Sequence, residues 1–142
     1  MAIYNGYRVA SLEDGHTISD VHTYRWIVED NFGDQFYGRN IQNKEVLREN
    51  FTIYRASDGS RSVVIPSGNY RFSENILGLA TASQRVFSMN GFLLKGEYYD
   101  GDRTQINVSS SWKPSRNFQL GLQYVNNEIE LPHGDFSTSL YA

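Results

Sequence analysis

Alternation between apolar and polar residues is clearest in the second half of the chain. From Arg103 to Lys113 the even positions include Ile106, Val108 and Trp112, whereas the odd positions are all polar. Side chains of a strand point alternately to two faces, so this period predicts a strand with one apolar and one polar face. At about 3.3 Å per residue the segment would be about 36 Å long, which suffices to cross a hydrocarbon core of about 30 Å.

The same alternation returns from Phe118 to Val125, after a segment of turn-like composition at 114–117. The apolar faces of the two strands coincide only if even positions pair with even ones. This predicts that Trp112 lies opposite Phe118 and that Val108 lies opposite Leu122.

A third strand is expected upstream, from Arg85 to Tyr99, followed by Asp100-Gly-Asp102 as a three-residue hairpin connection. On this connection Tyr98 would face Thr104. We therefore expect consecutive antiparallel hairpins in this half of the chain.

The remaining segments show the same character less cleanly. Strands are expected at His16 to Asp30, at Asn50 to Ala56, once or twice within Gly68 to Ser83, and from Phe136 onward. Only Gln42 to Glu49 has helix-forming composition, and it is predicted as a short helix in a loop. Together these segments predict an all-β fold, an antiparallel up-and-down meander of long hairpins in one sheet, with residues 1–142 as a single region.

Composition supports strands and excludes several functions. The chain has ten Tyr, eight Phe and twelve Gly against three Pro, which favours strands joined by tight turns. A net charge of -3 with intermixed signs argues against nucleic acid as a partner. The absence of Cys excludes disulfides, thiolate metal sites and a cysteine nucleophile. The sequence shows neither a signal peptide nor a long apolar run. A long apolar run would indicate a membrane helix, but membrane strands lack one because their apolar residues alternate with polar ones.

An apolar face opposite a polar face on long strands is typical of an outer-membrane β-barrel. The barrel interpretation predicts that outer-membrane lipid and the remaining strands of the same barrel are the partners. The lipid-facing aromatic candidates are Tyr98, Trp112, Phe118 and Tyr124. The candidates for the interior are Arg103, Gln105, Asn107, Lys113, Gln119 and Gln123. The alternative is a soluble periplasmic β-sandwich that binds or degrades carbohydrate, because a sandwich core also alternates apolar and polar positions.

Several short motifs between residues 51 and 142 carry a family resemblance. They are Ile65-Pro-Ser-Gly-Asn-Tyr70, Gly96-Glu-Tyr-Tyr-Asp-Gly-Asp-Arg103, Lys113-Pro-Ser115, Tyr124-Val-Asn-Asn127 and Ile129-Glu-Leu-Pro-His-Gly-Asp-Phe136. In order and spacing they resemble the C-terminal barrel domain of bacterial outer-membrane proteins with a family-nine carbohydrate-binding-like module, the family called domain of unknown function 5916.

The resemblance implies a bacterial outer-membrane location and a structural or transport-related role linked to carbohydrate, with an oligosaccharide as a further partner. Family members are several times longer, and the last motif is internal to them, so we expect an internal fragment of a barrel. Members are often labelled hydrolases by association with the neighbouring module. That label identifies no catalytic residue in this chain.

Two groups of acidic and histidine residues are candidates for chemical sites. His16, Asp20 and His22 are all at even positions, so their side chains share one face of the predicted strand and could bind one metal ion. On one straight strand, however, the two histidines are too far apart for this. Glu128 and Glu130 would lie about 7 Å apart on one face, as glycosidase carboxylates can, yet solvated charge explains them better. We therefore predict no catalytic, metal or cofactor site.

Overall fold

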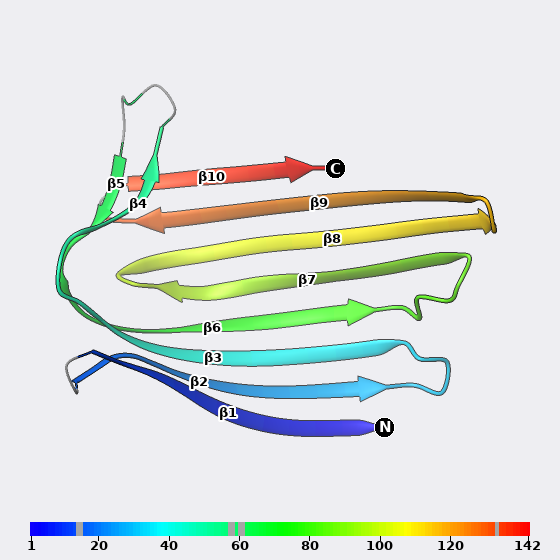
Figure 1. The fold of residues 1–142 in the computed structure, drawn as a ribbon, viewed down its shortest axis with the longest axis horizontal. Helices are drawn as coiled ribbons and strands as arrows, with labels where there is room; N and C mark the ends of the chain where they lie inside the picture. Colours follow the sequence, from blue (N-terminus) through cyan, green and yellow to red (C-terminus); the bar gives the residue numbers. More distant parts are fainter. Residues whose placement is uncertain (14–15, 57–58, 60–61, 133) are drawn as a thin grey trace.

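The computed structural model describes residues 1–13, 16–56, 59, 62–132 and 134–142, and these contain strands and turns. Eight long strands form one antiparallel sheet in the order β1, β2, β3, β6, β7, β8, β9, β10, and β4 and β5 form a separate hairpin (Figure 1). The predicted all-β meander is confirmed. The strands are β1 (Ala2–Glu13), β2 (His16–Glu29), β3 (Gln35–Leu47), β4 (Phe51–Arg55), β5 (Ser62–Ile65), β6 (Gly68–Ala80), β7 (Phe87–Tyr98), β8 (Gly101–Ser115), β9 (Phe118–Leu131) and β10 (Gly134–Tyr141). The described residues contain no helix of the length and apolar character that crossing a membrane requires.

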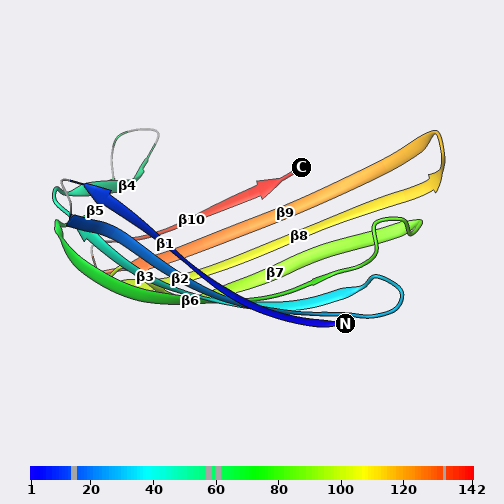
Figure 2. The ribbon, with the colours of Figure 1, turned by 60° about the horizontal axis from the view of Figure 1, so that its bottom comes forward.

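The large sheet is curved, and its two faces differ in exposure. Figure 2 shows β8 to β10, and on the other side the end of β1 near the hairpin, lying above the central strand β6, on the side where the β4–β5 hairpin lies. On β6, Phe72, Glu74 and Gly78 of one face are buried, whereas Leu77 and Leu79 of the other face are exposed. The face of Phe72 is therefore the concave face of the sheet, and the face of Leu77 is the convex face.

The hydrophobic core lies at one end of the concave face, against the β4–β5 hairpin. Val63 and Ile65 of β5 are 0% exposed and pack with Ile129 and Leu131 at the end of β9. Partly buried side chains around them are Leu47, Ile53, Tyr54, Tyr70, Tyr98, Tyr99 and Phe136. The prediction of a single sheet is wrong at this hairpin, because two short strands do not reveal from their own sequence which neighbours they will pair with.

The helix expected at Gln42 to Glu49 is also wrong, because Gln35–Leu47 is strand β3. β3 lies between β2 and β6 and pairs with both over most of its length. Helix propensities of ordinary residues differ by less than about 0.7 kcal/mol, whereas the two neighbouring strands satisfy the backbone groups of β3 on both sides. Pairing in the sheet therefore overrides the local preference.

The β8–β9 hairpin keeps the predicted parity but not the predicted partners. Trp112 lies opposite Leu120 instead of Phe118, and Val108 lies opposite Tyr124, two residues further along β9 than expected. The turn has two residues instead of four, and a bulge precedes it on β8. The short turn pairs an odd position with an even one, and the extra residue of the bulge restores the pairing of even positions. The apolar faces of β8 and β9 coincide for this reason.

The β7–β8 hairpin differs more, because Tyr98 does not face Thr104. Tyr98 pairs with Gly101, and Thr104 pairs with Lys95. The connection is a two-residue turn that begins at Tyr99, whose φ of 55° is left-handed. Such turns favour Gly, Asn or Asp at these positions, so a tyrosine there could not be expected from the sequence. Odd positions of β7 therefore share a face with even positions of β8.

Two glycines in the central strands receive aromatic rings from their cross-strand partners. Gly38 of β3 lies opposite Trp26, and Gly78 of β6 lies opposite Tyr37. A Cβ atom at either glycine would collide with the ring of its partner. An aromatic ring that covers a strand glycine helps to fix the register of both strands. The two pairs lie on opposite faces, so they hold β2, β3 and β6 together from both sides.

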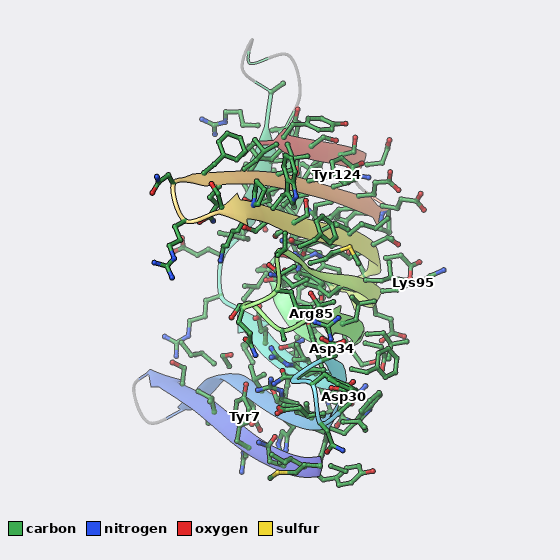
Figure 3. All side chains as sticks on the ribbon, turned by 90° about the vertical axis from the view of Figure 1, so that its right-hand side faces the viewer. Tyr7, Asp30, Asp34, Arg85, Lys95 and Tyr124 are labelled. Atoms are coloured by element: carbon green, nitrogen blue, oxygen red, sulfur yellow. The ribbon has the colours of Figure 1, made fainter. Side chains whose placement is uncertain are left out.

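Two carboxylates, Asp30 and Asp34, bind the turns at the end of the sheet away from the β4–β5 hairpin. Figure 3 looks at the sheet from this end. Asp34 accepts hydrogen bonds from the Ala82 backbone at 2.9 Å and from the Arg85 guanidinium at 2.7 Å. Asp30 accepts from the backbone N–H groups of Asp34 at 2.9 Å and Phe32 at 2.8 Å. These backbone hydrogen bonds, first that of Asp34, lower the pKa of Asp30 below its ordinary 3.8. The β2–β3 turn is thus bonded to the β6–β7 loop.

Replacing Asp34 with alanine should weaken this end of the sheet. The variant loses the two hydrogen bonds that the carboxylate accepts from the Arg85 guanidinium and the Ala82 backbone N–H, so we expect the free energy of unfolding to fall by about 1–2 kcal/mol. Urea unfolding of the full chain in detergent micelles measures the change. Asn31→Ala in the same turn is the control, and an equal loss in both variants would contradict a specific role of Asp34.

Candidate functional site

The convex face carries a band of apolar side chains that crosses all eight strands of the large sheet. At its centre Leu77, Leu93 and Ile106 are cross-strand neighbours with exposed fractions of 52%, 45% and 38%. Among the described residues the band contains no charged side chain. We call this surface the apolar band, and its members are Tyr4, Tyr24, Trp26, Val28, Phe36, Leu77, Leu79, Phe87, Met89, Leu93, Ile106, Val108, Trp112, Phe118, Leu120, Leu122, Tyr124 and Tyr141.

A polar zone adjoins the apolar band on the side of the β4–β5 hairpin. Its first convex side chains are His22 on β2, Asn75 on β6 and Asn126 on β9. Along the ladder Asn75 is offset by two residues from His22, and Asn126 is offset by two more in the same direction. The boundary therefore runs obliquely across the strands. Tilted strands that cross a flat apolar layer produce such an oblique boundary.

Three of the four aromatic residues predicted to face lipid belong to the apolar band. Trp112 and Phe118 meet edge to face with ring centroids 6.0 Å apart, and Tyr124 lies further along β9 on the same face. Tyr98 does not belong to the band. It lies on the concave face, 5.7 Å from Phe72 between ring centroids, because odd and not even positions of β7 share the convex face.

Most residues predicted for the interior share the concave face. Cross-strand pairing places Arg103, Gln105, Asn107 and Gln123 on that face. Gln119 joins them, because its amide donates to the hydroxyl of Ser111 on the same face at 3.1 Å. Lys113 differs, because it lies within the bulge of β8. Its ammonium donates to the carbonyl of Ser83 at 3.4 Å, which holds it beside the β6–β7 loop at the end of the sheet.

Arg103 is the centre of a polar network on the concave face. Its guanidinium donates to Glu74 at 3.3 Å, to Asn127 at 2.9 Å and to Gln105 at 2.7 Å. Gly96 pairs with both Glu74 and Arg103, so the strand between them has no side chain in the way. The guanidinium carbon also lies 5.4 Å from the ring centroid of Tyr98. Arg103 is therefore held on several sides.

Glu74 is the partner that the sequence did not identify. Only 7% of the residue is exposed, and charged side chains are rarely buried to this degree unless they are paired. The segment from Gly68 to Ser83 shows too little alternation to assign its faces, so only the register with β3 and β7 places Glu74. A buried carboxylate bonded to an arginine gives the concave face a polar and charged centre.

Asp20, one of the candidate metal ligands, forms an ion pair with Arg8 instead. Arg8 donates to both carboxylate oxygens of Asp20 at 2.7 Å, and the His22 Nε2 lies 3.4 Å from the same carboxylate. The hydrogen bond from Arg8 lowers the pKa of Asp20 below its ordinary 3.8. The side chain of His16 lies outside the described part of the structure. Within that part, no group of three or more histidine or acidic residues could hold a metal ion.

Glu128 and Glu130 share one face, as expected, and that face is the convex one. They pair with Thr104 and Asp102 of β8 in the polar zone, and both are exposed. Neither lies in the buried, apolar surroundings that a catalytic acid needs. The arrangement is that of solvated charges.

A shallow hollow lies where the apolar band meets the polar zone on β1, β2, β3 and β6. Its lining includes Tyr4, Tyr24 and Trp26 beside the amides of Asn40 and Asn75. The Asn40 amide donates to Asn75 at 2.9 Å. Aromatic rings next to amides occur at membrane interfaces and also suit contact with sugar rings.

Comparison of the chain with protein-family models, curated proteins and solved structures finds no match. The resemblance of residues 51–142 to domain of unknown function 5916 therefore stays a prediction.

Proposed function

We propose that this chain forms part of the wall of a bacterial outer-membrane β-barrel, with a structural or transport-related role. The apolar band carries this proposal. On β8 it extends from Ile106 to Trp112, about 20 Å along the strand, which is comparable with the ~25 Å apolar belt of outer-membrane barrels. In the proposed barrel the band lies against lipid, and the concave face lines the interior.

The concave face supports the same proposal from the other side. Barrel interiors are polar, and Glu74, Arg103, Gln105 and Asn127 form a bonded polar network at the middle of this face. A soluble single-layer sheet would leave the apolar band exposed to water, which is uncommon for large contiguous apolar surfaces. Lipid removes that cost on the convex side.

The sheet has two edges, β1 and β10, and is not closed. Unpaired backbone groups in hydrocarbon cost several kcal/mol each. The proposal therefore requires further strands of the same barrel to pair with both edges. Their pairing would be antiparallel, since strand direction alternates throughout the sheet.

A soluble periplasmic protein that binds or degrades carbohydrate is the second candidate. The hollow beside Tyr4, Tyr24 and Asn40 favours it, because rings and amides together can contact a sugar. A sandwich of this class needs a second sheet over the apolar band, and in the described residues only the concave face meets another sheet. We therefore prefer the barrel.

The location of the full-length gene product tests the proposal. We expect it to sediment with the outer membrane and to migrate differently on a gel before and after boiling, as closed barrels do when boiling unfolds them. A freely soluble monomer that migrates identically in both states would contradict the barrel and favour the carbohydrate-binding alternative.

A further inference from the structure

Arg25 and Arg39 lie directly opposite each other on the concave face. They are cross-strand partners on β2 and β3. The Cβ atoms of directly opposed residues in an antiparallel sheet are about 4.5–5.5 Å apart, and like charges so placed repel. The sheet therefore makes two arginines direct cross-strand neighbours, an arrangement of like charges that costs energy.

Neither guanidinium is neutralised by a protein group among the described residues. The Nε atoms of Arg25 and Arg39 are both buried and have no hydrogen-bond acceptor. The nearest acidic residue along the concave ladder, Glu74, is bonded to Arg103. Glu29, the last residue of β2, is a further acidic residue on this face, and it accepts a hydrogen bond from Gln35 at 2.8 Å. The arginine pair is left with positive charge and unused donors.

The surroundings of the pair strengthen its field. Ile27, Ile41 and Ile76 occupy neighbouring positions on the concave ladder, so much of the local environment is apolar. Charges interact more strongly where water is partly excluded. Asn5 is the cross-strand partner of Arg25 and adds an amide that can donate hydrogen bonds.

We infer that Arg25 and Arg39 together bind an oxyanion, the phosphate, sulfate or carboxylate group of a small solute that reaches the concave face. The planar guanidinium fork bonds two oxygens of such a group at once. One anion between the two arginines replaces their repulsion with attraction to both. The apolar band lies on the opposite face, so the ligand comes from the aqueous side, and the site does not depend on the membrane proposal.

Titration of inorganic phosphate into the full chain, held in micelles of an uncharged detergent, tests the site. At constant ionic strength we expect phosphate to bind and to raise the unfolding temperature, whereas chloride does neither. Arg25→Gln or Arg39→Gln should weaken phosphate binding about tenfold or more, since each removes charge-assisted hydrogen bonds. Arg116→Gln, in the exposed β8–β9 turn, is the matched control and should bind like the original chain.

The unfolding temperature in the absence of phosphate is a second test, in which the variants should be more stable than the original chain. Each glutamine variant should unfold at a higher temperature than the original chain in chloride, because the repulsion is gone, and phosphate should stabilise it less. If a glutamine variant does not fold, Arg39→Lys keeps the charge while losing the fork, and it should fold and bind phosphate more weakly. Equal phosphate affinity of the original chain and the Arg25 and Arg39 variants, or an equal loss in Arg116→Gln, would overturn the inference. Failure of the outer-membrane test leaves this result unaffected.

Discussion

Replacing Glu74 with alanine should lower the free energy of unfolding by about 3 kcal/mol, since removing one partner of a buried pair leaves the other charge uncompensated. The side chain of Glu74 is 9% exposed and that of its partner Arg103 is 24% exposed, so water screens the remaining guanidinium only in part. The same change leaves three arginines and no carboxylate near the middle of the concave face. Glu74→Gln should lose less, because its amide oxygen can still accept from Arg103.

Denaturant unfolding of the full chain in detergent micelles measures both variants. Glu97→Ala is the matched control, because Glu97 lies on the neighbouring strand β7 but is exposed on the convex face. We expect it to change the free energy of unfolding by less than about 0.5 kcal/mol. A similar cost at Glu74 and Glu97 would show that the concave network does not stabilise the sheet.

The strands of the second half could be predicted because their alternation is local. Arg103 to Lys113 and Phe118 to Val125 lie within β8 and β9, and the apolar faces of the two strands do coincide. A side-chain period of two requires no knowledge of neighbouring strands. The secondary structure of segments with weaker alternation, above all Gln42 to Glu49, depends instead on pairing with strands that are distant in sequence.

Exact partners could not be predicted because they depend on turns and bulges. One bulge in β8 moves Trp112 from Phe118 to Leu120 without changing its face. By contrast, the two-residue turn at Tyr99 exchanges the faces of β7 and moves Tyr98 to the concave side. A shift of one residue reverses every side chain of a strand, so a small error in turn length becomes a large error in assignment.

The charged centre of the concave face escaped prediction for a related reason. Arg25 and Arg39 come from strands whose register was unknown, and Glu74 meets Arg103 across a third strand at Gly96. The interior candidates Gln105 and Asn107 were found because their strand alternates cleanly. On strands with weak alternation, the face and the partners of a charged residue are known only once the pairing of the strands is known.

Neighbouring arginine substitutions on β8 should separate a lipid-facing surface from a water-facing one. Val108 lies in the apolar band, between Gly91 and Tyr124, and Ser109 lies on the concave face between Asn90 and Gln123. An arginine facing the middle of a bilayer costs a barrel about 2–4 kcal/mol, whereas interior positions tolerate charge. We therefore expect Val108→Arg to reduce strongly the heat-modifiable, outer-membrane form of the full-length gene product, and Ser109→Arg to leave it near the original level.

The two variants place the same side chain on consecutive residues of one strand, so strand propensity and added charge are matched between them. Val108 is 38% exposed, and on a protein surrounded by water an arginine there would cost less than about 0.5 kcal/mol. Equal assembly of both variants would therefore mean that the apolar band does not contact lipid. A loss confined to Ser109→Arg would mean that the concave face is the one packed against another layer, as in the carbohydrate-binding alternative. Only a loss confined to Val108→Arg agrees with an apolar band that faces the membrane.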